Sequence, residues 1–281
     1  MRLNNVKKTS LMAIMLAAVI SLSGVVMPMK VAAEEKIIEV AVVGDSISEF
    51  NGDSCGVPMA IHNGTLWMGT SNYNSTNSTK TGVKNNGQMW YSQMQNALNE
   101  SGKKFRISRV DAIGGSMVYD TGDTIGTWKS YAEHKGGAYC IGSDKPFSTY
   151  TGFDGNYGTK SRLESLGNPN IIVIEAGTND VLNNVDQSSF TTAYANMIGR
   201  YHSMYPNAKI YVVLPSTNLG GISGNGIMYR GVINWLYQNG WPISGVIDPA
   251  VIEQYRYDGI HYTEIGQFYL GYLAADKILE K

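Results

Sequence analysis

Short apolar runs rich in β-branched residues alternate with longer amphipathic segments along most of this chain. Runs of this kind are typical of buried strands, and they occupy residues 36–43, 105–113, 170–176, 209–214 and 245–247. Between them, apolar residues recur near helical spacing over residues 88–99, 188–205, 226–238 and 263–279. Strands that alternate with helices need crossover connections. We therefore expect an α/β fold, a three-layer α/β/α sandwich around a mostly parallel sheet.

Two long stretches, residues 50–86 and 116–168, interrupt this alternation. The first is rich in Asn, Ser, Thr and Gly, and the second is rich in Gly, Tyr, Ser and Asp without clear periodicity. Long loops in a compact domain are usually functional or disordered. Because the sequence contains no evident repeat or interdomain linker, we expect one domain over residues 34–281, with substrate choice located in these two loops.

The N-terminus differs in character from the rest of the chain. Lys7 and Lys8 precede an apolar run over residues 11–27, and residues 31–33 are small enough for a signal peptidase. We predict a signal peptide over residues 1–33 and a secreted, extracellular protein with no stable membrane association after cleavage. A retained membrane anchor is the alternative, because about 17 apolar residues is near the lower limit for spanning a bilayer.

The charge balance supports this division and excludes one class of partner. The chain has 22 Lys and Arg against 23 Asp and Glu, but four of the basic residues and no acidic one lie in the first 33 positions. The remaining residues therefore have 18 positive charges against 23 negative ones. An acidic protein has no excess of cations to neutralise phosphates, so we expect no nucleic-acid partner.

Cys55 and Cys140 are the two cysteines of the chain, and both follow the predicted signal peptide. An oxidising compartment would permit a disulfide between them, although a domain of this size does not need one. A disulfide and two separate thiols both stay open, and neither cysteine has the Cys/His spacing of a zinc site.

A serine follows the first predicted strand, in the sequence Gly44-Asp45-Ser46-Ile47-Ser48. Open parallel sheets bind ligands beyond the carboxyl ends of their strands, so Ser46 is placed where a nucleophile would be useful. The motif is not the G-x-S-x-G elbow of α/β-hydrolases. The alternative interpretation is an ordinary turn in which Asp45 or Ser46 caps the next segment.

A serine nucleophile needs a base, and one of the four histidines of the chain stands out. His261 follows Asp258 by three positions, between the last predicted strand and the last predicted helix, whereas the other three histidines have no acid at that spacing. Asp258 would orient the imidazole ring while the second ring nitrogen faces Ser46.

Two further sequences follow predicted strands and therefore lie at the same edge of the sheet. Acyl transfer develops negative charge on a carbonyl oxygen, and the side-chain amide of Asn179, in Gly177-Thr178-Asn179-Asp180, could stabilise it. A simple turn residue is the alternative. In Ile113-Gly114-Gly115-Ser116, the missing side chains would let a backbone N–H approach the same oxygen.

These four sequences, GDSIS, IGGS, GTND and DGIH, together resemble those of the GDSL-like or SGNH hydrolase family. The resemblance covers nearly the whole predicted mature chain. It implies a flavodoxin-like sandwich and hydrolysis of esters without a metal or another cofactor. It also implies that Ser46 is the nucleophile, His261 the base and Asp258 the third member of the triad.

By the same resemblance, Gly115 and Asn179 complete an oxyanion hole with the backbone N–H of Ser46. Two departures from the family pattern concern these sequences: Ile47 replaces the usual leucine, and IGGS is shorter than the Asn-led pattern of the family. The second departure leaves the choice between Gly114 and Gly115 open.

Composition suggests the class of substrate. The chain has 18 Tyr and 5 Trp, and its long loops are polar, which fits a surface where aromatic rings pack against sugar faces. We predict a secreted serine esterase that removes O-acetyl groups from carbohydrate. The alternatives are a lipase or other acyl-ester hydrolase acting on lipids, and a non-catalytic secreted carbohydrate-binding module, because much of the aromatic content can also serve packing.

Overall fold

The computed structural model describes residues 35–50, 81–112, 115–121, 140–145, 161–219, 222–223 and 225–280. All the helices and strands it describes lie within Ile37–Lys281. The predicted signal peptide, residues 1–33, lies outside the described residues, as do Cys55 and most of the two long loops. Export and the domain boundary at residue 34 therefore stay predictions, and the choice between a disulfide and two separate thiols stays open.

Five parallel strands form the central sheet, and their order across it is β2-β1-β3-β4-β7. They are β1 (Ile38–Gly44), β2 (Phe105–Ala112), β3 (Ile171–Glu175), β4 (Lys209–Val213) and β7 (Gly245–Ile247). Counted along the chain, this is the 2-1-3-4-5 order of flavodoxin-like folds. The sequence-based prediction of a flavodoxin-like α/β sheet is confirmed, and every predicted strand lies within two residues of an observed one.

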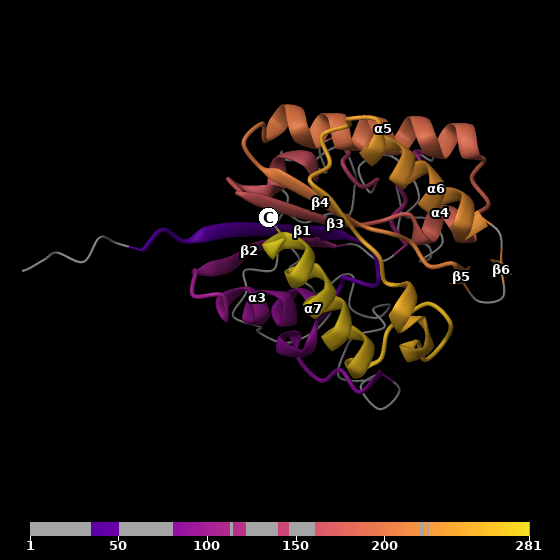
Figure 1. Cartoon of the computed structure of the whole chain (residues 1–281). Coiled ribbons are helices and arrows are strands. Elements are labelled where there is room, and N and C mark those ends of the chain that lie inside the picture. Colours follow the sequence, from indigo (N-terminus) through magenta and orange to yellow (C-terminus); the bar gives the residue numbers. More distant parts are fainter. Residues whose placement is uncertain are drawn as a thin grey trace, which may run out of the picture. The chain divides into compact units, whose positions relative to one another are not determined.

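Four long helices cover the two faces of the sheet (Figure 1). They are α3 (Trp90–Asn99), α5 (Gln187–Met204), α6 (Asn225–Gln238) and α7 (Glu264–Leu279), all expected from helical spacing. In Figure 1, α5 and α6 lie above the strands, and α3 and α7 lie below them. Within the ranges that the structure describes, no helix combines the length and apolar character needed to cross a bilayer.

Several short elements lack a sequence signal because they are too short to show a period. They are α4 (Thr178–Leu182), the hairpin of β5 (Asn218–Leu219) and β6 (Ile222–Ser223), and 3-10 helices at Asn86–Gln88, Leu163–Leu166 and Ala250–Tyr255. The Leu163–Leu166 turn lies inside the stretch 116–168, which the sequence alone predicted to be irregular. It directly follows Arg162, whose side chain is fully buried.

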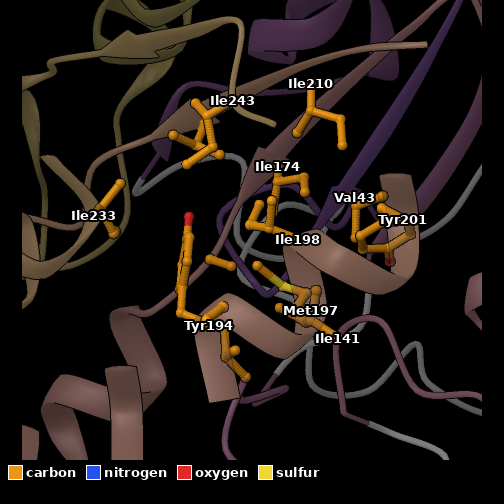
Figure 2. Packing of buried hydrophobic residues seen from close by; sticks show 14 of the residues in the cluster. Val43, Ile141, Ile174, Tyr194, Met197, Ile198, Tyr201, Ile210, Ile233 and Ile243 are labelled. Carbon is orange, nitrogen blue, oxygen red and sulfur yellow. The ribbon is translucent and has the colours of Figure 1, made fainter. Parts of the chain in front are cut away.

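Strand β1 is buried on both faces, as expected for the middle of a parallel sheet covered by helices. Because side chains alternate along a strand, Val40 and Val42 join the core beneath α3 and α7, while Val43 joins the core beneath α5 and α6. Figure 2 shows this second core, where Tyr194 and Ile198 of α5 are drawn with sheet residues such as Val43.

Helices α3 and α7 pack with their backbones unusually close. A Cβ atom on Gly271 of α7 would lie 2.5 Å from the carbonyl oxygen of Trp90 and 2.8 Å from the nitrogen of Met94, both in α3. Only glycine permits this approach. The segment with Asp258 and His261 directly precedes the N-terminal end of α7.

Candidate active site

Ser46 and His261 meet in the structure although 215 positions separate them. Ser46 lies in the turn after β1, and its Oγ is 2.9 Å from His261 Nε2. Asp45 shapes this turn, because its backbone carbonyl accepts a hydrogen bond from Ser48 N–H and its Oδ1 accepts one from Ile47 N–H. Ser46 is 3% exposed and His261 is 7% exposed, so bulk water reaches neither side chain freely.

Asp258 holds the opposite side of the His261 ring. Its Oδ2 is 2.7 Å from His261 Nδ1, and its Oδ1 accepts hydrogen bonds from the backbone N–H groups of Ile260 and His261. Gly259 makes this tight turn possible by adopting φ 81°, a left-handed conformation that favours glycine. The Asp-Gly-Ile-His spacing therefore builds a loop whose carboxylate binds both its own backbone and the imidazole.

The same contacts keep Asp258 ionised. Burial by itself would raise its pKa, but the hydrogen bond to His261, the charge of that ring and the two backbone N–H donors lower the pKa below its ordinary value. An ionised Asp258 favours the tautomer of His261 with a proton on Nδ1, which leaves Nε2 as a hydrogen-bond acceptor toward Ser46. This is the protonation state that a general base requires.

Asn179 lies in the first turn of α4, directly after β3, and connects two neighbouring turns. Its Nδ2 is 3.1 Å from Asp45 Oδ2 and 2.9 Å from the carbonyl oxygen of Ser116. The amide thus binds the turn that carries Ser46 and the turn that follows β2. Gly115 lies in that second turn and is buried. Gly114 lies outside the described residues.

The carboxyl edge of the sheet therefore brings together the five residues singled out by the sequence. They come from the ends of four separate strand-to-helix connections, which is where open parallel sheets bind ligands. Three of them are joined by direct side-chain contacts, and Asn179 and Gly115 connect to this group through their neighbours; the five are Ser46, Gly115, Asn179, Asp258 and His261.

Comparison with protein families assigns the chain to a known one. The model of the GDSL-like Lipase/Acylhydrolase family matches residues 112–266, more than half of the chain. The chain belongs to this family. The match includes Gly115, Asn179, Asp258 and His261, and it begins beyond Ser46. The prediction of an ester hydrolase of the GDSL or SGNH type is thereby confirmed.

Solved structures share the fold of this GDSL-like hydrolase at low sequence identity. A family two carbohydrate esterase from Clostridium thermocellum in complex with cellohexaose is 17% identical, with a TM-score of 0.53. The alignment covers 85% of this chain and 63% of that one, so this chain spans less than two thirds of that protein.

Two further structures match over nearly their whole length. The Clostridium thermocellum family 3 carbohydrate esterase is 14% identical with a TM-score of 0.51, and the alignment covers 87% of this chain and 96% of that one. TesA is 17% identical with a TM-score of 0.51, and the alignment covers 86% of this chain and 98% of that one. A search of curated protein sequences found no match.

Three carboxyl groups are buried next to the candidate active site of this GDSL-like hydrolase. Burial raises the pKa of Asp45 to about 6 and that of Asp180 to about 6. Burial and the negative charge of Asp45 raise the pKa of Glu175 well above its ordinary value. The interaction between the two carboxyl groups lowers the pKa of Asp45 and raises that of Glu175, so Glu175 keeps a shared proton more readily than Asp45 does.

Glu175 also belongs to a chain of hydrogen bonds that reaches Trp90, in the core beneath α3 and α7. Ser48 Oγ donates to Glu175 Oε2 at 3.1 Å, and Trp90 Nε1 donates to Ser48 Oγ at 3.1 Å. Asp45 in turn accepts from Asn179. An acid inside the apolar strand β3 was the sequence signal for this network, because a buried carboxyl group needs polar partners.

We expect the free energy of unfolding to increase as the pH is lowered from 7 to 5. The pKa values of Asp45 and Asp180 are about 6 in the folded protein and 3.8 ordinarily. Between these values the folded protein binds more protons than the unfolded chain, so stability falls as pH rises, by up to about 1.4 kcal/mol per pH unit for each proton. Asp258 does not change the pH dependence of stability between pH 5 and 7, because its pKa is lowered and the carboxyl group is ionised in this range in both the folded and the unfolded protein. Urea unfolding at pH 5, 6 and 7 measures the effect.

A matched pair of variants tests the part of this pH dependence that comes from Glu175. Glu175→Gln keeps a donor toward Asp45 but cannot titrate, so the slope should become shallower than in the wild-type protein. Glu100→Gln changes an exposed glutamate and should leave the slope unchanged. A wild-type stability that increases steadily from pH 5 to pH 7 contradicts the prediction.

Proposed function

We propose that this chain is a serine esterase that works through an acyl-enzyme formed on Ser46. One observation carries the proposal: Ser46 Oγ is 2.9 Å from His261 Nε2, and His261 Nδ1 is 2.7 Å from Asp258 Oδ2. A serine hydroxyl is a weak nucleophile by itself, and a base within hydrogen-bond reach activates it. A carboxylate on the other ring nitrogen orients the base and stabilises the imidazolium.

In the first step, His261 removes the proton of Ser46 while Oγ attacks the ester carbonyl carbon. The tetrahedral intermediate collapses when His261 gives that proton to the leaving alcohol, and the acyl group stays on Ser46. In the second step, His261 removes a proton from water, and the resulting nucleophile attacks the acyl-enzyme. Collapse of the second intermediate returns the proton to Ser46 and releases the carboxylic acid.

We assign the developing negative charge to an oxyanion hole made by the backbone N–H of Ser46, the N–H of Gly115 and the amide of Asn179. The amide nitrogen of Asn179 now contacts Asp45 and Ser116. To stabilise the substrate oxygen, Asn179 must therefore exchange one of these two hydrogen bonds for a hydrogen bond to that oxygen. Such exchange is reasonable, because catalytic hydrogen bonds often align only in the substrate complex.

For the substrate, we propose an O-acetyl group on carbohydrate. The aromatic and polar composition of the chain supports this choice, and so do two neighbours of the same fold that are described as carbohydrate esterases. We also propose that residues 1–33 direct export, which would place the enzyme where extracellular glycans are found. A lipid ester is the competing substrate, because the family includes lipases and acylhydrolases.

Two measurements on the purified protein test this proposal. A fluorophosphonate probe should label the folded protein on Ser46, located by mass spectrometry of the peptides, and should not label heat-denatured protein. An unlabelled native protein would support a binding module and contradict the esterase.

The second measurement compares kcat/KM for acetylated cellobiose and for p-nitrophenyl esters of increasing acyl length. We expect acetyl esters to be the better substrates by at least about 10-fold, the difference that a few methylenes make in a shaped pocket. A preference for long acyl chains would overturn the carbohydrate assignment and leave the serine mechanism intact.

A further inference from the structure

Arg162 places a fully buried positive charge behind the candidate active site. Its side chain has 0% exposure and precedes the 3-10 helix Leu163–Leu166. Nε lies 3.0 and 2.9 Å from the two carboxylate oxygens of Asp111. Nη1 donates to Ser116 Oγ at 2.8 Å, and Nη2 donates at 3.0 Å to the backbone carbonyls of both Gly44 and Asp111. One guanidinium thus reaches three separate segments.

Two of these three segments lead directly into parts of the proposed oxyanion hole, and the third lies beside them. Gly44 is the last residue of β1 and precedes the Asp45-Ser46 turn. Ser116 directly follows Gly115, and its carbonyl oxygen accepts the hydrogen bond from Asn179. Asp111 pairs with Val43 in the register of β1 and β2. Arg162 therefore binds a residue two positions before Ser46 and the residue that follows Gly115, and it reaches Asn179 indirectly through Ser116.

We propose that Arg162 is a positioning residue for ester hydrolysis, which keeps the ends of β1 and β2 and the Gly115-Ser116 turn at the spacing that the oxyanion needs. This inference rests on the proposed function. Arg162 does not touch the reacting atoms itself. It acts through Gly44, and through Ser116 on the amide of Asn179.

The chemistry of the guanidinium explains why arginine stands here. A buried ion pair by itself is weak support for stability, because desolvation of both charges offsets their attraction. The planar fork of five N–H groups, however, can bind a carboxylate, a hydroxyl and two carbonyls at fixed angles. A lysine ammonium is a single point with three donors, so it can neutralise Asp111 but cannot span the same partners.

The backbone that carries Arg162 is itself held in place. Ser165 Oγ donates to the carbonyl oxygen of Arg162 at 2.8 Å, and Tyr205 of the α5 C-terminus donates its hydroxyl to the carbonyl oxygen of Leu163 at 2.7 Å. The N–H of Leu163 donates to the carbonyl oxygen of Ser143. The guanidinium therefore projects toward the ends of the strands from a turn that several hydrogen bonds hold, of which the Tyr205 bond is only one.

The decisive variant is Arg162→Lys, which retains the positive charge next to Asp111. We expect kcat for p-nitrophenyl acetate to fall by on the order of 10²-fold, the usual effect of losing one oxyanion donor, while KM changes by less than about 3-fold. The rate of fluorophosphonate labelling should fall in parallel, because phosphonylation uses the same hole. All rates are expressed per folded molecule, from circular dichroism and denaturant titration.

Tyr205→Phe is the matched control, because it removes a hydrogen bond from the same support without changing any donor of Arg162. Its kcat per folded molecule should stay within about 2-fold of wild type. If Arg162→Lys and Tyr205→Phe lose activity only in proportion to their folded fractions, Arg162 is a structural residue and the inference is wrong.

Ser116→Ala keeps the question answerable if Arg162→Lys does not fold. It preserves the pair of Arg162 and Asp111 and removes the Nη1 contact alone. We therefore expect kcat to fall by about 10-fold, far less than the fall expected when a triad residue is removed. An unchanged kcat in Ser116→Ala overturns the inference. Failure of the proposed function is distinct, because the wild-type protein would then neither hydrolyse the ester nor label on Ser46.

Discussion

Replacing Ser46 by alanine should lower kcat for p-nitrophenyl acetate by roughly 10⁵- to 10⁶-fold, the loss found when the nucleophile of a serine hydrolase is removed. Without Oγ no acyl-enzyme forms, and the oxyanion hole can assist only a direct attack by water. The variant should also lose fluorophosphonate labelling entirely. A stopped-flow assay measures the fast rate of the wild-type protein, and an assay over long times measures the slow rate of Ser46→Ala.

The fold should survive this substitution. Alanine removes one buried oxygen, and the hydrogen bond to His261 is worth about 1 kcal/mol of net stability. Ser203→Ala, on the exposed side of α5, is the matched control and should keep both activity and labelling. Undiminished turnover in Ser46→Ala would mean that another group carries the chemistry, and the proposed mechanism would be abandoned.

The architecture was predictable because each long element carries its own signal. Strands β3 and β4 are apolar, β-branched runs, and α5 and α7 repeat apolar residues at helical spacing, so their bounds were predicted to within two residues. The parallel orientation of the strands follows from their alternation with helices. Helix α4 has no sequence signal because five residues are too few to show a period, so a simple turn stays the alternative interpretation of Asn179 in the sequence.

The meeting of the candidate site residues was predictable for a topological reason. Each lies after a strand, and parallel strands end at one edge, so side chains far apart in sequence converge there. What the sequence could not provide is the order of contacts at that edge. The hydrogen bond between Asn179 and Asp45, for example, depends on the distance between α4 and the turn after β1, which the sequence does not specify.

The sequence does not show which buried polar groups behind the site bind one another. Glu175 at the end of β3 and Asp111 near the end of β2 were visible as acids in apolar strands, and both needed partners. Arg162 gave no signal, because it lies in an irregular stretch without periodicity, more than 50 positions from Asp111 in the chain. Only the tertiary structure pairs the charge with its carboxylate.

Replacing His261 by alanine should lower kcat by about as much as Ser46→Ala does, again roughly 10⁵- to 10⁶-fold, because nucleophile and base act as one unit. Asp258→Asn should cost less, about 10⁴-fold, since the asparagine amide favours the wrong tautomer of His261 but leaves the ring in place. His202→Ala, an exposed histidine of α5, should be fully active and serves as the control.

A double variant with both His261→Ala and Asp258→Asn tests whether Asp258 takes part in catalysis together with Ser46 and His261. If Asp258 acts only through His261, then His261→Ala with Asp258→Asn should be no slower than His261→Ala alone, because the carboxylate has no ring left to orient. The contacts predict this outcome: Asp258 binds the His261 ring and the backbone of the same loop, at 2.7 and 2.9 Å. A single Asp258→Asn variant with wild-type kcat would show that Ser46 and His261 suffice, with the carboxylate confined to holding the loop.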